Sequence, residues 1–584
     1  MSMHAIDTEQ FFKNKVLGHP AGLFVLFFTE MWERFSYYGM RAILVLFLTS
    51  SLLEGGWAWP RETALALYGT YTSMVYLTPI LGGMLADRVL GYKKAVVLGA
   101  FLMTLGHASM AVETPAFLYI GLAFLIFGNG FFKPNMTSIL SHMYVKHPEK
   151  KDGAYTLFYM GVNAGAFLGI MLCGYLGEKV GWSWGFGLAG VFMFLGMIQF
   201  HLSRNIFGQI GDQPAGGEAS AADIAEITTE ENGGKLNPFT TIDKLLIAVT
   251  SIIAIVWIIN DPMSKIYDFN IFGGDSMANN AIIGAFLLFL VIMFTRITRY
   301  STTTRDRMIA VLGFAIFYMF FWLCFEQAGG SMTIFADDYT QRSLVGAGAM
   351  AFKISNTLLT VVPIGILTYV LYSLFSKTFK DYSLANVVLG FSFVLIWAIV
   401  IWMLYKEFQK DETEIAASWF SILNSFFIIA FGPVFSKIWE SKYNPSGPVK
   451  YAIGLILLGI GFLALAYGAS GIPQGAQTAS VSIIWLILAY LFHTLGELCI
   501  SPVGLSYVSK LVPGRMIGIM FGIWYLAVAI GNKLAGSLGG MIDKISTTYS
   551  MSTFFMIFTF IPFAGAVVLF LTSPLFKKLM HGYK

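Results

Sequence analysis

The chain has 584 residues, of which 56% are hydrophobic and only 12% are charged, with a net charge of +4. Soluble domains carry about 25% charged residues, so the composition excludes a soluble multidomain enzyme, a disordered chain and a disulfide-built secreted module. The net charge is too small to indicate a nucleic-acid partner. Because the apolar residues would fill about sixteen spans of about 20 residues each, we expect an all-α polytopic membrane protein embedded in a lipid bilayer.

Apolar runs separated by charged gaps predict six spans in the first third of the chain. They lie near 21–50, 64–86, 93–112, 116–142, 153–177 and 183–203. A stretch rich in Gly, Ala, Glu and Thr follows at 206–243, and this composition predicts a linker that does not cross the membrane. Ten further spans are predicted near 244–260, 279–298, 307–330, 354–376, 384–405, 415–438, 449–468, 479–509, 516–541 and 551–576.

The placement of Lys and Arg predicts the orientation of these spans. Cytoplasmic loops carry an excess of Lys and Arg. With the N-terminus inside, 25 of the 37 Lys and Arg residues fall on the inner side and 8 on the outer side. We therefore expect an even number of spans, both termini in the cytoplasm, and a cytoplasmic linker at 206–243.

The first predicted span contains an unusual set of ionisable side chains. A charge at the centre of a bilayer costs at least about 2.5–3.5 kcal/mol on insertion scales, so it usually has a partner or faces a cavity. At about 100° per residue on a helix, the set falls within about 140° of arc. Its members are Glu30, Glu33, Arg34, Tyr37, Tyr38 and Arg41. The set either pins helices together or, as we favour, lines a water-filled path.

Other charged residues lie in distant predicted spans. Lys133 lies in GNGFFKPN, Glu326 in FWLCFEQ and Glu497 in HTLGELCISP. Each acid alone is compatible with a satisfied core group, but together they supply both signs on several helices. This pattern is expected of a central cavity that holds a charged solute and moves protons.

Enzymatic chemistry has no candidate site in the sequence. We find no serine–histidine–acid arrangement, no metal-ligand spacing and no phosphate-binding loop, so we expect neither catalysis nor a cofactor. The three cysteines, Cys173, Cys324 and Cys499, each lie inside an apolar run and are interpreted as small apolar fillers. Gly128 and Gly130 in the GNGFFK block are interpreted as positions of close helix packing.

Two motifs indicate a family. GGMLADRVLGYKK (82–94) resembles the short cytoplasmic signature of the major facilitator superfamily, in which Gly82 and Gly83 would allow tight packing. The motif at 30–39, EMWERFSYYG, is similar to the ExxERFxYYG motif of the proton-dependent oligopeptide transporters, the peptide-carrying branch of that superfamily. Further matching blocks lie, in the family's order, at 128–135, 158–169, 321–327, 495–506 and 522–536.

The resemblance implies roles for individual residues. Proton coupling would involve Glu30, Glu33, Arg34, Arg41 and Glu326, with Glu326 exchanging a salt bridge with Arg41 near the outer mouth. Lys133 would hold the carboxylate of a peptide together with Arg34, and Glu497 would receive its amino terminus. The resemblance further implies hydrogen bonds from Asn163 and Asn424 and side-chain pockets lined by Tyr37, Tyr38, Tyr76, Trp322 and Trp524. The aromatic residues are also compatible with plain core or interface packing, and Trp322 beside Glu326 is the least so.

The chain departs from the family pattern in three respects. Ser425 follows Asn424 where the family often has proline, and Val528 stands where it commonly has a small polar residue. Family members usually have twelve or fourteen spans. The pair near 244–260 and 279–298 fits the fourteen-span plan, whereas the pair near 354–376 and 384–405 fits neither and indicates either an unusual subfamily or too high a count.

The predicted organisation is a major facilitator fold of two six-helix bundles with about four extra helices, two between the bundles and two after the seventh core helix. The expected domains are an N-terminal bundle (1–205), the linker (206–243), two inserted helices (244–300) and a C-terminal bundle (301–584) that includes the extra pair near 354–405. The expected function is proton-coupled import of di- and tripeptides across the plasma membrane, or the inner membrane of a bacterium. The sequence leaves two alternatives open: the same fold carrying another small solute such as nitrate, or a membrane sensor without transport.

Overall fold

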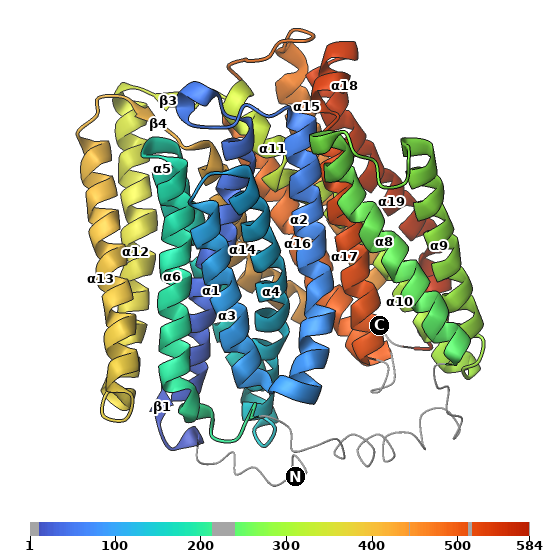
Figure 1. Cartoon of the computed structure of the whole chain (residues 1–584), viewed down its shortest axis with the longest axis horizontal. Helices are drawn as coiled ribbons and strands as arrows, with labels where there is room; N and C mark the ends of the chain where they lie inside the picture. Colours follow the sequence, from blue (N-terminus) through green and yellow to red (C-terminus); the bar gives the residue numbers. More distant parts are fainter. Residues whose placement is uncertain (1–10, 213–239, 443, 512–516, 583–584) are drawn as a thin grey trace. The chain divides into compact units, whose positions relative to one another are not determined.

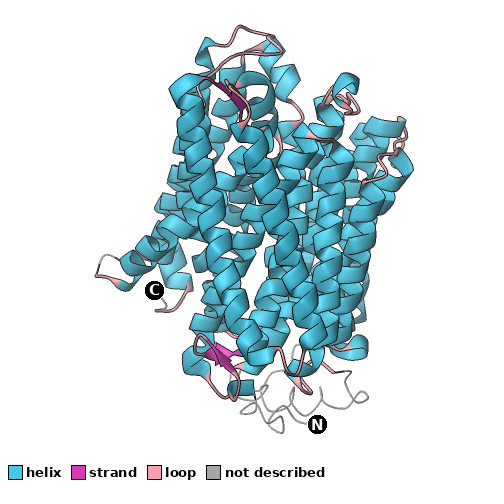
Figure 2. Cartoon of the chain, turned by 90° about the vertical axis from the view of Figure 1, so that its left-hand side faces the viewer, coloured by secondary structure: helices cyan, strands magenta, loops and turns pink. Residues whose placement is uncertain are grey.

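The computed structural model describes residues 11–212, 240–442, 444–511 and 517–582, nearly all of them in helices (Figure 1, Figure 2). The strands in these ranges form two short antiparallel ladders. One pairs β1 (Lys15–Val16) with β2 (His19–Pro20), and the other pairs β3 (Ser343–Leu344) with β4 (Thr413–Glu414). Most of the predicted linker, at 213–239, lies outside the described residues.

The chain divides into two compact units, of which the first comprises Met1–Ala58, Leu77–Gly217 and Thr333–Ile429. Its helices are α1 (Ala21–Thr49), η3 (Leu52–Glu54), η4 (Ala86–Leu90), α3 (Tyr92–Met110), α4 (Pro115–Met143), α5 (Pro148–Lys179), α6 (Trp182–Ser203), η5 (Arg204–Phe207), η7 (Phe335–Tyr339), α12 (Gly346–Thr378), α13 (Ser383–Phe408) and η8 (Ala417–Ser421). Within this unit α5 and α6 pack against α1, and α3 packs against α4 and α6.

The second unit comprises Trp59–Tyr76, Glu218–Met332 and Ala430–Lys584. Its helices are α8 (Thr241–Tyr267), α9 (Asp275–Ile297), α10 (Thr302–Phe325), η6 (Glu326–Gly329), α15 (Gly447–Gly468), η9 (Ala469–Gly471), α16 (Ile484–Leu511), α17 (Ile517–Gly539), α18 (Ile542–Thr548) and α19 (Met551–Leu579). Three helices have residues in both units: α2 (Arg61–Leu85), α11 (Ser331–Ile334) and α14 (Ile422–Glu440).

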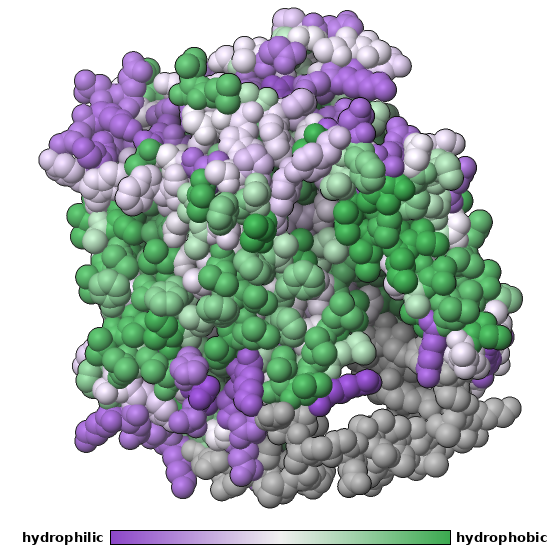
Figure 3. All heavy atoms as spheres, viewed as in Figure 1, coloured by the Kyte–Doolittle hydropathy of each residue, from purple (hydrophilic) through white to green (hydrophobic). Residues whose placement is uncertain are grey.

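A helix occupies each of the sixteen predicted spans. Among the described residues, twelve helical segments are long and apolar enough to cross a membrane. The predicted spans that fall short of this measure are α1, α2, α3 and α17, which are 19 to 29 residues long. In α1 the reason is its four charged side chains. On the face shown in Figure 3, hydrophobic side chains cover the middle of the helices and hydrophilic ones gather at their ends, as a bilayer requires.

The additional pair near 354–376 and 384–405 is confirmed as two long apolar helices, α12 and α13. They belong by their contacts to the first unit, because α13 packs against α6. The ring of Phe393 meets those of Phe28 and Trp32 on α1, with centroids 5.6 and 5.8 Å apart. The sequence places the pair in the C-terminal bundle only because it follows α10 in the chain. The order of helices along the chain does not specify which neighbouring helix an apolar face packs against.

The first inserted pair, α8 and α9, packs within the second unit. α8 is joined to α17 by a buried ion pair between Asp261 and Lys533. The Lys533 ammonium group also donates to Thr70 Oγ1 on α2 at 3.0 Å. Since Lys533 is almost wholly buried, this pair gives its charge the partner that a residue within the membrane requires.

Glycines allow the helices to approach closely where the sequence predicts it. A Cβ on Gly82 would lie 2.0 Å from the backbone oxygen of Gly130, and one on Gly128 would lie 2.7 Å from that of Gly99. Gly83 differs, because its nearest neighbours, atoms of Pro134, are at an ordinary 3.7 Å. The prediction of a packing role is therefore confirmed for Gly82, Gly128 and Gly130, whereas it is wrong for Gly83.

This difference provides a matched test. Gly82→Ala should destabilise the protein by about 1–3 kcal/mol, because the new methyl group meets backbone that cannot move aside. Gly83→Ala, on the adjacent residue of the same helix, should leave stability unchanged. Thermal unfolding in detergent measures both variants, and equal melting temperatures would contradict the close approach of α2 and α4.

Candidate functional site

The middle of α1 holds a buried cluster of opposite charges. The Nε atom of Arg34 lies 2.8 Å from Glu30 Oε1, one helical turn away, and 2.9 Å from Glu33 Oε2. All three side chains are almost completely buried. One guanidinium group therefore compensates two carboxylates, and without it both would be uncompensated charges in an apolar surrounding.

α4 contributes a second cation and an amide to this cluster. Asn129 Nδ2 donates a hydrogen bond to Glu33 Oε1 at 3.0 Å. Lys133, one turn further along α4, interacts electrostatically with Glu30, Glu33 and Arg34. The cluster thus contains two acids and two bases, and a proton or an anion that enters it changes its net charge.

The aromatic side chains of α1 lie on the following turns of the same helix. The guanidinium carbon of Arg34 lies 6.0 Å from the centre of the Tyr37 ring, and that of Arg41 lies 5.8 Å from the centre of the Tyr38 ring. The two tyrosine rings meet edge to face, 5.1 Å apart. Cations over aromatic faces gain about 0.5–2 kcal/mol, so these rings help hold the arginines in place.

The two predicted asparagines also lie in the first unit, on α5 and α14. Asn163 is buried and donates its amide hydrogen to the backbone oxygen of Tyr159, one turn earlier on α5, at 3.0 Å. Asn424 is half-buried near the beginning of α14. Asn163 thus satisfies its amide within its own helix, and its carboxamide oxygen can accept a further hydrogen bond.

In the second unit, aromatic side chains gather around Tyr318 on α10. The ring of Trp524 on α17 lies 4.6 Å from the Tyr318 ring, and that of Trp322 lies 5.8 Å from it. Ser501 and Glu497 on α16 interact with the same tyrosine. The predicted residues Trp322, Trp524 and Glu497, which lie on three helices, are therefore neighbours.

Tyr76 continues this aromatic group on α2. Its ring lies 6.2 Å from that of Trp322 and 6.4 Å from that of Tyr525. The result is an aromatic wall, and Glu497 interacts electrostatically with Tyr318 of this group. Aromatic side chains accept varied apolar groups, while a carboxylate can receive an ammonium group.

Glu326 follows α10 as the first residue of η6, one helical turn after Trp322. Its side chain is buried, and Tyr68 on α2 donates its hydroxyl hydrogen to Glu326 Oε2 at 3.4 Å. Arg41 belongs to the first unit and Glu326 to the second. The exchange of a salt bridge between them, and the convergence of both units on one cavity, stay predictions.

Several residues of these clusters are absent from the sequence-based set: Asn129, Tyr318, Tyr68, Tyr525 and Ser501. Asn129 had a detectable signal, because a polar amide one turn before Lys133 in an apolar helix needs a partner. No feature of the sequence distinguished the three tyrosines, since the chain contains 27 tyrosines and an aromatic residue in a membrane span is ordinary.

Comparisons with known proteins agree with these motifs. Residues 93–413 and 396–557 match the family described as the POT family. The peptide transporter YePEPT of Yersinia enterocolitica is 30% identical over 97% of this chain and 96% of its own length. A di-/tripeptide transporter of Lactococcus lactis subsp. cremoris is 28% identical over 96% of this chain and 97% of its own.

Solved structures give the same result. The crystal structure of peptide transporter POT in complex with sulfate is similar to this chain, with a TM-score of 0.70 and 28% identity. The match covers 99% of this chain and 100% of that one. The similarity therefore extends over the whole fold.

The cluster on α1 generates a prediction about stability. Arg34→Gln should destabilise the protein by about 3–5 kcal/mol, because it leaves two buried carboxylates with Lys133 as their one remaining cation. Replacing Glu30, Glu33, Arg34 and Lys133 together by Gln should recover much of this loss, since all four charges of the cluster are then gone. Thermal unfolding of the two variants checks the claim, and a fourfold variant less stable than Arg34→Gln would contradict it.

Proposed function

The chain belongs to the POT family and has the major facilitator fold, and from this premise we propose that it imports di- and tripeptides in symport with protons. The observation that carries the proposal is the buried cluster of Glu30, Glu33, Arg34 and Lys133. A transporter driven by protons needs acids whose protonation changes what their cationic partners bind. The names of the relatives, a peptide transporter and a di-/tripeptide transporter, support the substrate class.

The proposed mechanism begins with a proton on Glu33. The carboxylate of Glu33 engages Arg34 through Oε2 and Asn129 through Oε1. Protonation would remove the charge that holds the guanidinium group, leaving Arg34 and Lys133 available to a carboxylate. Binding of the proton and of the peptide's carboxyl group would therefore favour each other, which is the coupling that symport requires.

The peptide's amino terminus would bind Glu497, and its side chains would contact the aromatic residues beside it. A dipeptide has opposite charges roughly 5–7 Å apart, from the reach of about 3.5 Å per residue. The cationic pair of the first unit and Glu497 of the second would hold the two ends. Asn163 and Asn424 would add hydrogen bonds, and Tyr37, Tyr38, Tyr76, Trp322 and Trp524 would line the side-chain pockets.

Alternating access would expose this site to one side of the membrane at a time. In this proposal two six-helix bundles, within 1–205 and 301–584, move about the midplane site, while Glu326 and Arg41 exchange their salt bridge near the outer mouth. Both termini and the linker at 206–243 face the cytoplasm, as the Lys and Arg asymmetry indicates. The protein would lie in the plasma membrane, or in the inner membrane if the source is bacterial.

Uptake of labelled dialanine into liposomes tests the coupling. With an acid-outside gradient the unmodified chain should accumulate dialanine, and Glu33→Gln should lose at least about tenfold of this gradient-driven uptake while retaining exchange of dialanine without a gradient. Glu440→Gln is the control, because Glu440 is an exposed carboxylate at the end of α14. Gradient-driven uptake unchanged in Glu33→Gln would refute the role of this acid.

Recognition of the amino terminus is tested by competition. In the unmodified chain, dialanine should compete with labelled dialanine much better than N-acetyl-dialanine, which has no ammonium group. Glu497→Gln should weaken dialanine about tenfold or more, since a hydrogen bond to a charged group contributes about 1.5–3 kcal/mol. Equal competition by the two compounds in the unmodified chain would exclude this role of Glu497, and competition by nitrate instead of dialanine would favour another solute.

A further inference from the structure

The pair α12–α13 is a module whose two ends are joined. β3 precedes α12, β4 follows α13, and the two strands form an antiparallel ladder. The backbone amide of Ile415 also donates to the backbone oxygen of Arg342 at 3.0 Å. The segments that enter and leave the module therefore lie side by side, as Figure 1 shows at the labels β3 and β4.

One face of α5 contacts the end of α13 and the segment that leaves the module. Met171, Gly174, Tyr175 and Glu178 are spaced as neighbours on a helix surface. The Met171 backbone oxygen accepts a hydrogen bond from Trp419 Nε1 at 2.9 Å, and the Tyr175 hydroxyl donates to Glu407 Oε1 at 3.0 Å.

Gly174 lets this segment reach the helix backbone. A Cβ on Gly174 would lie 2.2 Å from Ser418 Oγ, so a larger residue would push Ser418 away. The leaving segment is therefore in direct contact with α5 at the turn that contains Gly174 and Tyr175.

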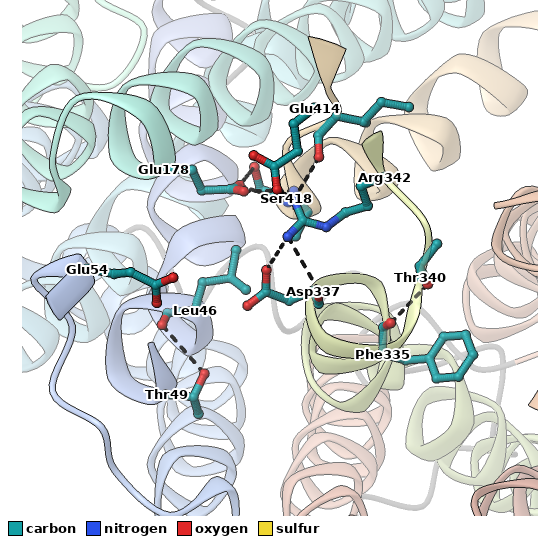
Figure 4. Close-up of polar contacts among 12 residues, drawn as sticks. Leu46, Thr49, Glu54, Glu178, Phe335, Asp337, Thr340, Arg342, Glu414 and Ser418 are labelled. Atoms are coloured by element: carbon teal, nitrogen blue, oxygen red, sulfur yellow. Dashed lines mark hydrogen bonds and ion pairs between the residues drawn. The ribbon is translucent and has the colours of Figure 1, made fainter. Parts of the chain in front are cut away.

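Glu178 is the strongest polar element of this contact (Figure 4). Its carboxylate accepts hydrogen bonds from the backbone amides of Ala417 and Ser418, at 2.7 and 3.0 Å, and from the Ser418 hydroxyl. These groups form the first turn of η8, immediately before α14. Three charge-assisted bonds to a single carboxylate make Glu178 the main attachment of this turn to α5.

Arg342 and Lys179 bind the same segment through Ile415 and Glu414. Arg342 donates to Asp337 Oδ1 at 2.7 Å and to the backbone oxygen of Ile415 at 2.8 Å, and it lies 3.3 Å from Glu414. Lys179 pairs with Glu414. Burial opposes ionisation of Glu414, but the hydrogen bond from Lys179 and the charges of Lys179 and Arg342 outweigh it and lower its pKa. This pair therefore stays intact in mild acid and is lost only as the pH falls through that lowered pKa.

The connectivity gives this attachment a mechanical consequence. The chain passes from α10 of the second unit through 333–342 into the module, and from 413–421 into α14, which continues into the second unit. The start of α14 is thus tied to α5 through the segment 413–421. Alternating access requires the two bundles to move relative to one another, so this binding opposes any movement in which the start of α14 leaves α5.

We propose that Glu178 is a positioning residue that latches η8, and with it the start of α14, to α5, and that release of this latch is a step in alternating access. The proposal deepens the transport function proposed above and rests on it. It gives the additional helix pair a role, because α12 and α13 anchor the latched segment against the first unit.

Distance measurements between spin labels test the latch. Labels at Val180→Cys, next to α5, and at Ile429→Cys on α14 use exposed sites within the first unit, and the three native cysteines are buried. Glu178→Gln and Glu178→Ala should raise the ratio of the long to the short distance population about tenfold. Ser418→Ala, which removes one of the three bonds, should give a smaller rise in the same direction.

Glu113→Gln is the matched control, because Glu113 accepts a hydrogen bond from Ser183 at 2.7 Å in the same unit and is a carboxylate outside the module. It should leave the distances unchanged. Unchanged distances in Glu178→Gln and in Ser418→Ala, in protein with the parent's thermal stability, would overturn the latch. Absence of peptide uptake by the unmodified chain would overturn the proposed function instead, while the distance result would still stand.

Discussion

The cost of placing charges in an apolar environment is the constraint on which the rest of this structure depends. α1 carries two acids and an arginine in its buried middle, and the two carboxylates are stable there because the Nε atom of Arg34 lies within 3 Å of both. The amide of Asn129 and the charge of Lys133 extend the requirement to α4. The charges of the candidate site thus also fix the contact between α1 and α4. A change in the protonation of Glu30 or Glu33 would therefore alter that contact.

A second requirement follows, because a charged helix needs a close and regular neighbour. α5 provides it with glycines spaced four residues apart, and Cβ atoms on Gly165 and Gly169 would lie 2.2 and 2.1 Å from the backbone oxygens of Met31 and Phe35. Backbones that touch at successive turns exclude lipid and water from the back of the cluster. The glycine block at 158–169 is therefore explained by packing against the charged motif at 30–39 of α1.

The positions of the helices and the charged residues of the candidate site could be predicted from the sequence, because both follow from local rules. Apolar runs end where charges begin, so α12 and α13 could be predicted even though the family plan has no place for them. The sequence was insufficient wherever a contact joins distant segments. The association of α13 with α6, the bond from Asn129 to Glu33 and the grouping of Trp322 and Trp524 around Tyr318 depend on how faces pair. A single sequence contains no periodicity or spacing that encodes this pairing.

α5 contacts both the charged helix α1 and the segment that follows the additional helix pair. One face of it is in backbone contact with the charged helix, at Gly165 and Gly169, and another face binds the segment after the additional helix pair, at Gly174 and Glu178. A helix touched by backbone at successive turns cannot rotate or slide independently of its partner, because packed interfaces have discrete arrangements. Any displacement of α1 that follows protonation of Glu33 therefore carries Glu178 with it. The charge cluster and the latch then respond as parts of one rigid pair of helices, which requires no further residues to relay a signal between them.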